Sequence, residues 1–196
     1  MERQGTVMIP YLGSAGWYAR HVGELLGLPS GLPPEGMDPA RLLRTVIMSA
    51  TGERLLSVPV AGGAHAFRRH ATMDAPLSEH GDWRRVHLGA INAEYGRTPC
   101  FAHLYPAIER ALDARHTTLR QVSEPLHSMV MSMLLPQRGC PEAMAALREE
   151  WLRRSGFFME MARETEPHVC PDVSVLDLLM RHGAATLPLL LALGNN

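Results

Sequence analysis

The chain has 196 residues, of which 46% are hydrophobic and 20% are charged, proportions typical of a globular protein that buries a core. The formal net charge is −1 at pH 7, so the charge balance gives no support for binding to nucleic acid or to an anionic membrane surface. All 19 basic residues are arginines, which excludes chemistry based on a lysine side chain, such as a Schiff base.

The cysteines and the apolar segments indicate a cytoplasmic protein. The three cysteines are widely spaced and form no C-x-x-C motif, so the sequence predicts neither a zinc ribbon nor a thioredoxin-type site. The first residues contain no apolar stretch of the kind found in signal peptides. The longest apolar run, residues 184–193, is well short of the ~20 residues that a membrane span requires, so we expect no span.

The first forty residues contain a predicted strand, a helix and a loop. Residues 6–11 have the apolar pattern of a short buried strand. Residues 17–26 place their apolar side chains on one helical face, and Gly27 follows as a stop. Residues 29–39 hold too many prolines and glycines for regular structure and are predicted to form a loop.

A β-hairpin is predicted next, in which residues 44–49 pair antiparallel with residues 54–60. Gly52 can supply the positive φ that a tight turn between them needs. Pro59 cannot donate a hydrogen bond to a partner strand, so we expect it at the end of its strand or with its nitrogen facing away from the partner. Residues 66–73 are predicted to form a third extended segment at the edge of the same sheet.

The chain after Pro76 has helical patterns. Trp83, His87 and Ile91 recur every four residues, which places them on one face of a helix that Asp82 would cap. Further helices are predicted over residues 105–114, from Thr118 to residue 135 (with a kink or a later start at Pro125), from Pro141 to just before Gly156, and from Ser174 until Gly183.

Strands followed by helices indicate an α+β fold, in which a small mixed or antiparallel sheet from the N-terminal half packs with a helical C-terminal half. We expect residues 1–196 to form a single domain. Ser174 and Asp177 have the spacing of a capping box, so Asp177 is predicted to cap a helix and to face away from any cleft. The apolar face of that helix, including Leu176, should dock on the sheet or on the Trp83 helix.

Three stretches of this sequence together resemble the WbqC-like family. They are the segment with Trp83, His87, Tyr95 and Pro99-Cys100-Phe101, the strand-like residues 55–60, and the C-terminal run 171–179 followed by Gly183. Members of this family are bacterial and are often encoded in O-antigen and other surface-polysaccharide gene clusters. The resemblance implies a transferase that places an aminoacyl or acyl group on an amino sugar, with a small-molecule or sugar-nucleotide ligand and no specified cofactor. The alternative is a diverged binding or assembly protein without catalysis, because Leu43 replaces the family Asn and the family Lys has no counterpart.

The candidate site residues follow from the same resemblance. His87 would act as the catalytic general base, since a half-buried imidazole can accept a proton near neutral pH. Arg44 would hold an anionic carrier group, and Tyr11, Trp83 and Tyr95 would complete the substrate-binding set. Each has a structural alternative: His87 is equally consistent with a hydrogen-bonded core histidine, and Arg44 with a solvated charge at a strand edge.

Other chemistries have weaker support. A thiol nucleophile formed by Cys100 with His87 or His103 is conceivable, although the family pattern has an aromatic residue at the cysteine position. The histidine spacings suit neither one helix face nor one strand face, so no metal site is predicted. Residues 13–16 resemble a phosphate loop only in their two glycines and lack the rest of that motif. The sequence leaves the oligomeric state open.

Overall fold

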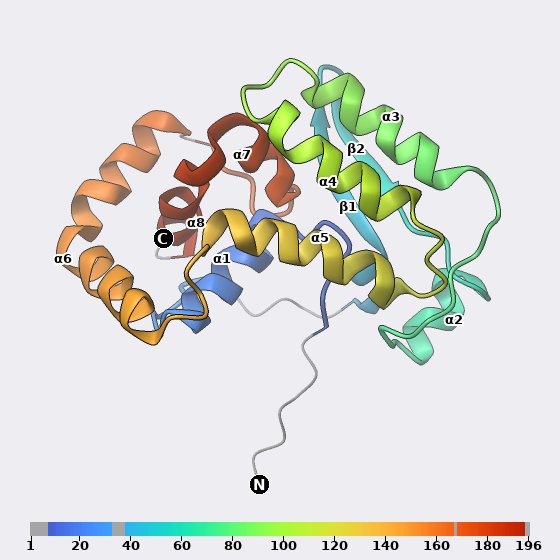
Figure 1. Cartoon of the computed structure of the whole chain (residues 1–196), viewed down its shortest axis with the longest axis horizontal. Coiled ribbons are helices and arrows are strands. Elements are labelled where there is room, and N and C mark those ends of the chain that lie inside the picture. The colour runs from blue at the N-terminus through green and yellow to red at the C-terminus, as the bar shows by residue number, and fades with distance from the viewer. Residues whose placement is uncertain (1–7, 33–37, 167, 195–196) are drawn as a thin grey trace, which may run out of the picture.

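The computed structural model describes residues 8–32, 38–166 and 168–194, and shows a small β-hairpin surrounded by helices (Figure 1). This arrangement confirms the predicted α+β class, with the sheet in the N-terminal half and helices throughout the C-terminal half. The elements are α1 (Ala15–Leu25), η1 (Pro39–Leu43), β1 (Arg44–Ser49), β2 (Gly52–Ser57), α2 (Gly63–Arg69), α3 (Trp83–Tyr95), α4 (Phe101–Asp113), α5 (Leu119–Leu134), α6 (Pro141–Thr165), α7 (Val175–His182), η2 (Gly183–Ala185) and α8 (Thr186–Gly194).

The hairpin has the predicted antiparallel pairing. Its register joins Arg44 to Ser57 at one end and Ser49 to Gly52 at the turn. Gly52 has a φ of +113°, a conformation that side chains with a Cβ rarely adopt, which explains glycine at this turn. Pro59 lies beyond the end of β2, as its missing N–H group requires.

Two of the predicted strands are not formed. Residues 66–73 are not extended, because Gly63–Arg69 forms the helix α2, whose buried residue is Phe67. Before it, the described part of the predicted first strand, residues 8–11, is irregular and turns at Tyr11 and Leu12, while Thr6 and Val7 lie outside the described residues. Pro10 lacks a donor for a strand ladder, which is a physical reason for this correction.

The helix α3 confirms the predicted face of Trp83, His87 and Ile91, all of which are buried. Asp82 precedes this helix without capping it through its side chain, and its carboxylate instead pairs with Arg85.

The helices α4, α5 and α6 differ from prediction mainly in their ends. Helix α4 begins at Phe101, earlier than expected, and tolerates Pro106 in its interior. The start of α5 is not delayed by Pro125, since Thr118 accepts a hydrogen bond from the N–H of Gln121 and caps the helix directly before Leu119. Helix α6 is interrupted at Arg154 (φ −119°, ψ 15°), close to the end predicted before Gly156, and a second helical segment that was not predicted continues to Thr165.

The C-terminal helices form the centre of the core. Helix α7 packs against β1 and α1, which confirms the predicted docking on the hairpin, and Leu176 is fully buried. Gly183 ends α7 with a φ of +55°. Helix α8 packs between α1 and α6, and Figure 1 shows α6 at the opposite end of the molecule from α2 and α3.

One apolar stretch has the length and composition of a membrane span. It is Val175–Gly194, which comprises α7, η2 and α8, and 61% of it is buried inside the fold. Burial of this kind is typical of core helices in a globular protein, and the packing of α8 between α1 and α6 accounts for the apolar sequence.

Three distant segments meet at one junction beside β1. The N–H groups of Ala15 and Gly16 donate to the carbonyls of Val173 and Pro171, at 2.7 Å and 2.8 Å. The N–H of Ser174 donates to the carbonyl of Val46 at 2.7 Å. The hydroxyl groups of Thr45 and Ser174 both donate to the carbonyl of Leu12, at 2.7 Å and 2.9 Å. We call residues 12–16, 45–46 and 171–175 the junction; it forms part of the walls of the two cavities described next.

Candidate functional site

Two cavities border the junction. The larger, the hairpin–α7 cavity, has a volume of about 530 Å³ and lies between the hairpin turn, the end of α3, the start of α7 and the segment before α7. The smaller, the Trp17 cavity, has a volume of about 220 Å³ and lies between the start of α1 and β1. The two share the junction as a wall, because Ser14 and Asp172 line the Trp17 cavity while Ala15, Val173 and Ser174 line the other.

Asp177 is the most distinctive group of the hairpin–α7 cavity. Its side chain is 14% exposed and lies in the first turn of α7. One carboxylate oxygen accepts a hydrogen bond from the hydroxyl of Tyr95 at 3.3 Å and another from the guanidinium of Arg181 at 3.1 Å. Burial raises the pKa of Asp177 above its usual range, although Arg181 and Tyr95 act in the opposite direction. A buried carboxylate held by two donors is a good candidate for proton transfer.

The predicted capping role of Asp177 is therefore wrong. Ser174 does cap α7, since its hydroxyl oxygen accepts from the N–H of Leu176. The reciprocal half of the box is missing, because the N–H of Ser174 donates to Val46 in the junction. The Asp177 carboxylate consequently turns to Tyr95 and Arg181, and it lines a cavity where the sequence predicted none.

The hairpin–α7 cavity is lined by more carboxylates than cationic side chains. Glu94, Glu166 and Asp177 line it together with the guanidinium of Arg181, the imidazole of His168 and the thiol of Cys170. Glu166 also contacts His182, with 3.1 Å between the carboxylate oxygen and the imidazole Nε2. An excess of carboxylates favours a ligand that carries a positive charge, such as a protonated amine.

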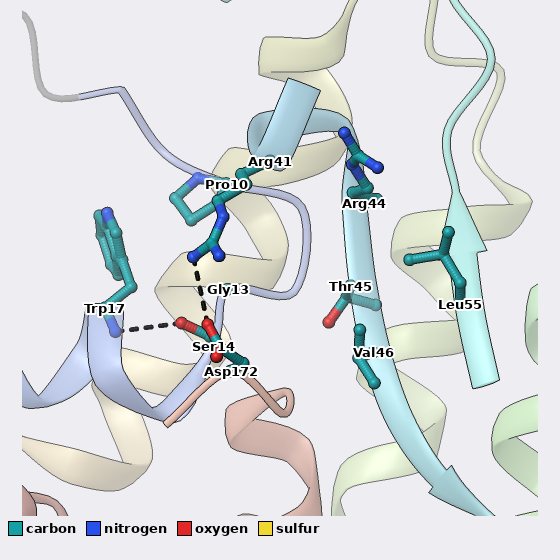
Figure 2. A pocket seen from close by; sticks show the side chains of 10 residues that line it. All are labelled: Pro10, Gly13, Ser14, Trp17, Arg41, Arg44, Thr45, Val46, Leu55 and Asp172. Atoms are coloured by element: carbon teal, nitrogen blue, oxygen red, sulfur yellow. Dashed lines mark hydrogen bonds and ion pairs between the residues drawn. The ribbon is translucent and has the colours of Figure 1, made fainter. Parts of the chain in front are cut away.

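The Trp17 cavity is lined by cationic and apolar side chains (Figure 2). Arg41 reaches across it to Asp172, with 3.2 Å between the guanidinium Nη1 and the carboxylate oxygen. Arg44 also lines this cavity but does not reach Asp172: its guanidinium donates to the carbonyl of Ala40 and to the carboxylate of Asp38, both at 3.1 Å. Asp38 binds Arg68 as well, and hydrogen bonds from that arginine lower the pKa of Asp38 to about 2.

The start of α1 is not a phosphate loop. The N–H groups of Ala15 and Gly16 are bonded to carbonyls of the junction, and the N–H of Trp17 donates to the hydroxyl oxygen of Ser14 at 3.2 Å. The first backbone donors of this helix are therefore engaged within the protein.

His87 lies in a buried aromatic cluster with Tyr11 and Trp83. The hydroxyl of Tyr11 lies 2.9 Å from Nδ1 of His87, and the Trp83 ring meets the imidazole edge-to-face with centroids 5.2 Å apart. Burial, assisted by the positive charge of Arg54, lowers the pKa of His87 to about 4, so the imidazole is neutral at pH 7. Burial also raises the pKa of Tyr11, so this hydroxyl remains protonated and shares a hydrogen bond with Nδ1 whose direction depends on the imidazole tautomer.

The five predicted site residues occupy three places in the structure. His87, Tyr11 and Trp83 form the buried cluster, and His87, at 3% exposure, lines neither cavity. Tyr95 reaches the hairpin–α7 cavity through its hydrogen bond to Asp177, and Arg44 borders the Trp17 cavity. A single cleft with His87, Arg44 and Tyr11 is not formed, and this separation is the arrangement expected of the non-catalytic alternative.

Several cavity residues were missed from the sequence. The pair Asp177 and Arg181 has the i, i+4 spacing of an ion pair on one helix face, so that signal was available. The contact of Arg41 with Asp172 joins residues 131 positions apart, and no local pattern predicts it. Cys100 lies at the start of α4 against Gly183, and within residues 8–32, 38–166 and 168–194 no group of three or more potential metal ligands is found.

Comparison with known proteins finds a matching family. The model of the WbqC-like protein family matches residues 42–138, a segment that runs from β1 through α5 and contains the Trp83 and His87 motif. No curated protein and no solved structure matches the chain. Most of the lining of the hairpin–α7 cavity lies after the matched segment. The match spans just under half of the chain and confirms the resemblance in residues 55–60 and in the segment with Trp83 and His87, so over residues 42–138 the chain is similar to the WbqC-like protein family.

Proposed function

We propose that the protein is a cytoplasmic transferase that places an acyl or aminoacyl group on an amino sugar during surface-polysaccharide synthesis. In this proposal the sugar, free or carried by a nucleotide, binds in the hairpin–α7 cavity. The observation that supports it best is the Asp177 carboxylate, held by Tyr95 and Arg181 in a cavity of about 530 Å³, a volume in the range of small-molecule sites. The family resemblance supports the biological context.

The charge of the cavity suits an amine acceptor. Glu94, Glu166 and Asp177 attract the ammonium form of an amino sugar. Asp177, whose burial raises its pKa, is a stronger base than an exposed carboxylate and accepts the proton that the amine loses. The amine nitrogen then attacks the carbonyl carbon of an activated acyl donor such as a thioester. An amide bond forms, and the bond from the carbonyl carbon to sulfur breaks with its electron pair on sulfur; the resulting thiolate takes the second proton that the nitrogen loses and leaves as the thiol.

His87 has a positioning role in this proposal. An imidazole whose pKa is about 4 is a weak base at neutral pH, and its Nδ1 is already engaged in a hydrogen bond with the hydroxyl of Tyr11. Tyr11 precedes the junction directly, and its N–H donates to the carbonyl of Leu42. His87 therefore holds the turn at Tyr11 and Leu12 in place, and this turn supports the junction, which forms a wall of both cavities.

The second candidate function is a binding or assembly protein without catalysis. It is favoured by the burial of His87, which lines neither the hairpin–α7 cavity nor that of Arg44, and by Leu43, which is buried where the family has a polar Asn. Both functions predict a ligand in the hairpin–α7 cavity, and only the first predicts transfer.

Ligand protection of Cys170 tests the proposed site. Cys170 lines the hairpin–α7 cavity, whereas Cys140, also exposed, precedes α6 outside it and serves as an internal control. We expect an amino-sugar nucleotide to slow alkylation of Cys170 by iodoacetamide, to leave Cys140 unchanged, and to raise the melting temperature by mass action. The N-acetylated nucleotide sugar, which lacks the amine charge, should protect less.

Variants separate binding from transfer. In Asp177→Asn, the amino-sugar nucleotide should protect Cys170 no better than its N-acetylated form does. In the control Asp113→Asn, a change at the exposed end of α4, the amino sugar should still protect better. Incubation of the parent with an acyl or aminoacyl thioester and the bound sugar should give the amide product by mass spectrometry. Protection of Cys170 without product would support the non-catalytic candidate, and no protection by any amino sugar would exclude the proposed ligand.

A further inference from the structure

We propose that the Trp17 cavity is a separate binding site for a small organic oxyanion, a phosphate monoester or a carboxylate, and that Asp172 is the internal counter-ion which this ligand displaces from Arg41. The site is distinct from the cavity of Asp177, so its existence does not depend on the proposed transferase function.

The ion pair of Arg41 and Asp172 has the geometry of a replaceable contact. The two side chains are 52% and 67% exposed, and they meet through one guanidinium nitrogen at 3.2 Å. Exposed pairs of this kind contribute little to stability, so a better-placed anion can compete for the guanidinium. Asp172 thus marks a position that a negatively charged oxygen already occupies.

The backbone around Asp172 is fixed, which limits the displacement to its side chain. The carbonyls of Pro171 and Val173 accept from Gly16 and Ala15, and the next N–H, that of Ser174, donates to Val46. A ligand at Arg41 therefore rotates the Asp172 side chain toward solvent and leaves the junction intact.

The charges around this cavity also favour an anion. Arg44 lines the cavity beside Arg41, and the nearest carboxylate to it, Asp38, is shared with Arg68. Among the described residues that line the cavity, two carry a guanidinium, Arg41 and Arg44, and one carries a carboxylate, Asp172. The hairpin–α7 cavity on the other side of the junction has the opposite excess, so the two cavities select different ligands.

The size and the walls define the rest of the ligand. A volume of about 220 Å³ holds an oxyanion and a small organic group, and apolar atoms of Pro10, Trp17 and Leu55 would contact that group (Figure 2). The suitable probes are phenyl phosphate and benzoate, with benzyl alcohol as an uncharged analogue of similar size.

Calorimetric titration of the full chain at low ionic strength tests the site. We expect Asp172→Asn to bind the preferred anion about fivefold more tightly, because the competing carboxylate is removed. Arg41→Gln should bind at least about tenfold more weakly, as loss of a charged hydrogen bond predicts. Arg153→Gln removes an arginine from a comparable exposed pair on α6 and should bind as the parent does. Added salt should weaken binding of the anion to the parent and to each of the three variants.

The relative affinity for phenyl phosphate and benzoate identifies which oxyanion the site takes, and binding of either supports the proposal. The proposal is overturned if Asp172→Asn binds the anion no more tightly than the parent does, or if Arg41→Gln binds it with the affinity of the parent. It is also overturned if the parent binds benzyl alcohol as tightly as it binds the anion. Melting temperatures of both variants close to that of the parent show that the fold is retained. Alkylation of Cys170 reports on the other cavity, so failure of either proposal is recognised separately.

Discussion

His87 and Asp177 are both largely removed from water, and burial shifts their pKa values in opposite directions. The pKa of His87 falls to about 4 and that of Asp177 rises above its usual range. Both shifts favour the neutral form of the group, as a low-dielectric environment does for any ionisable side chain. The two residues therefore have distinct effects on stability as the pH changes.

Acidification should destabilise the protein through His87. Its pKa in the folded state, about 4, is lower than the ~6.5 of an unfolded chain, so the neutral core imidazole contributes its full stability above pH 6.5. That contribution, roughly 3 kcal/mol, is lost as the pH falls from 6.5 to 4. Urea unfolding at pH 7 and pH 4.5 should show a smaller loss in His87→Asn, whose amide can still hydrogen-bond with Tyr11. Equal pH dependence of parent and variant would contradict this account.

Asp177→Asn should leave the unfolding free energy at pH 7 unchanged or raise it. Because the folded state raises the pKa of Asp177, the charged carboxylate costs stability at neutral pH, and this cost disappears as the pH falls below the unfolded value. The asparagine removes the charge and keeps an acceptor for Tyr95. Urea melts at pH 7 and pH 4 measure the difference. A loss of about 0.5–2 kcal/mol at pH 7 would instead indicate the capping role that the sequence predicted.

Helix α7 is fixed by its apolar face, which packs against β1 and α1. Leu176→Ala should lower the unfolding free energy by about 2–5 kcal/mol, since the side chain is fully buried and its removal leaves a cavity. The control is Leu152→Ala on α6, where the leucine is largely exposed, and its effect should stay within about 0.5 kcal/mol. Urea denaturation compares the two, and similar losses in both would show that burial is not the cause.

Gly183 connects α7 to the following helices in a conformation that alanine does not favour. Its φ is +55°, and a Cβ at this position would lie 2.9 Å from Sγ of Cys100. Gly183→Ala should therefore cost about 1–3 kcal/mol. A double-mutant cycle with Cys100→Ala should recover the part caused by the contact and leave the backbone part. Gly156→Ala, in the interior of α6 with open space around it, should instead stabilise by about 0.5–1 kcal/mol.

Local patterns predicted the elements that local physics determines. The antiparallel hairpin was predicted around Gly52, although its second strand, Gly52–Ser57, begins and ends earlier than expected, and the buried face of α3 followed from the four-residue spacing of Trp83, His87 and Ile91. The errors concern segments whose conformation depends on distant partners. Asp177 has the sequence position of a cap, but the N–H of Ser174 bonds to Val46, so the capping box cannot close. The cavity that results was not predictable from residues 174–177 alone.

The matched family segment is not a unit that could bury its own core. Residues 42–138 lack α1, α7 and α8, although α1 packs on α8 and α7 packs on β1. We expect a fragment of residues 42–138 to be unfolded, with little dispersion in its amide NMR spectrum, whereas the full chain should unfold in a single cooperative transition as one domain. A folded fragment would show that the chain contains a smaller autonomous domain.

The junction has a consequence for how the protein is made. Its hydrogen bonds connect residues 12–16 with residues 171–175, so they form only after residue 175 has emerged from the ribosome. Local helices and the hairpin can form earlier, but closing such a long loop is entropically costly and slow. Both cavities therefore arise late and together, in the step that joins these two segments. A nascent chain has no binding site for its ligands, and a chain truncated before Ser174 never acquires one.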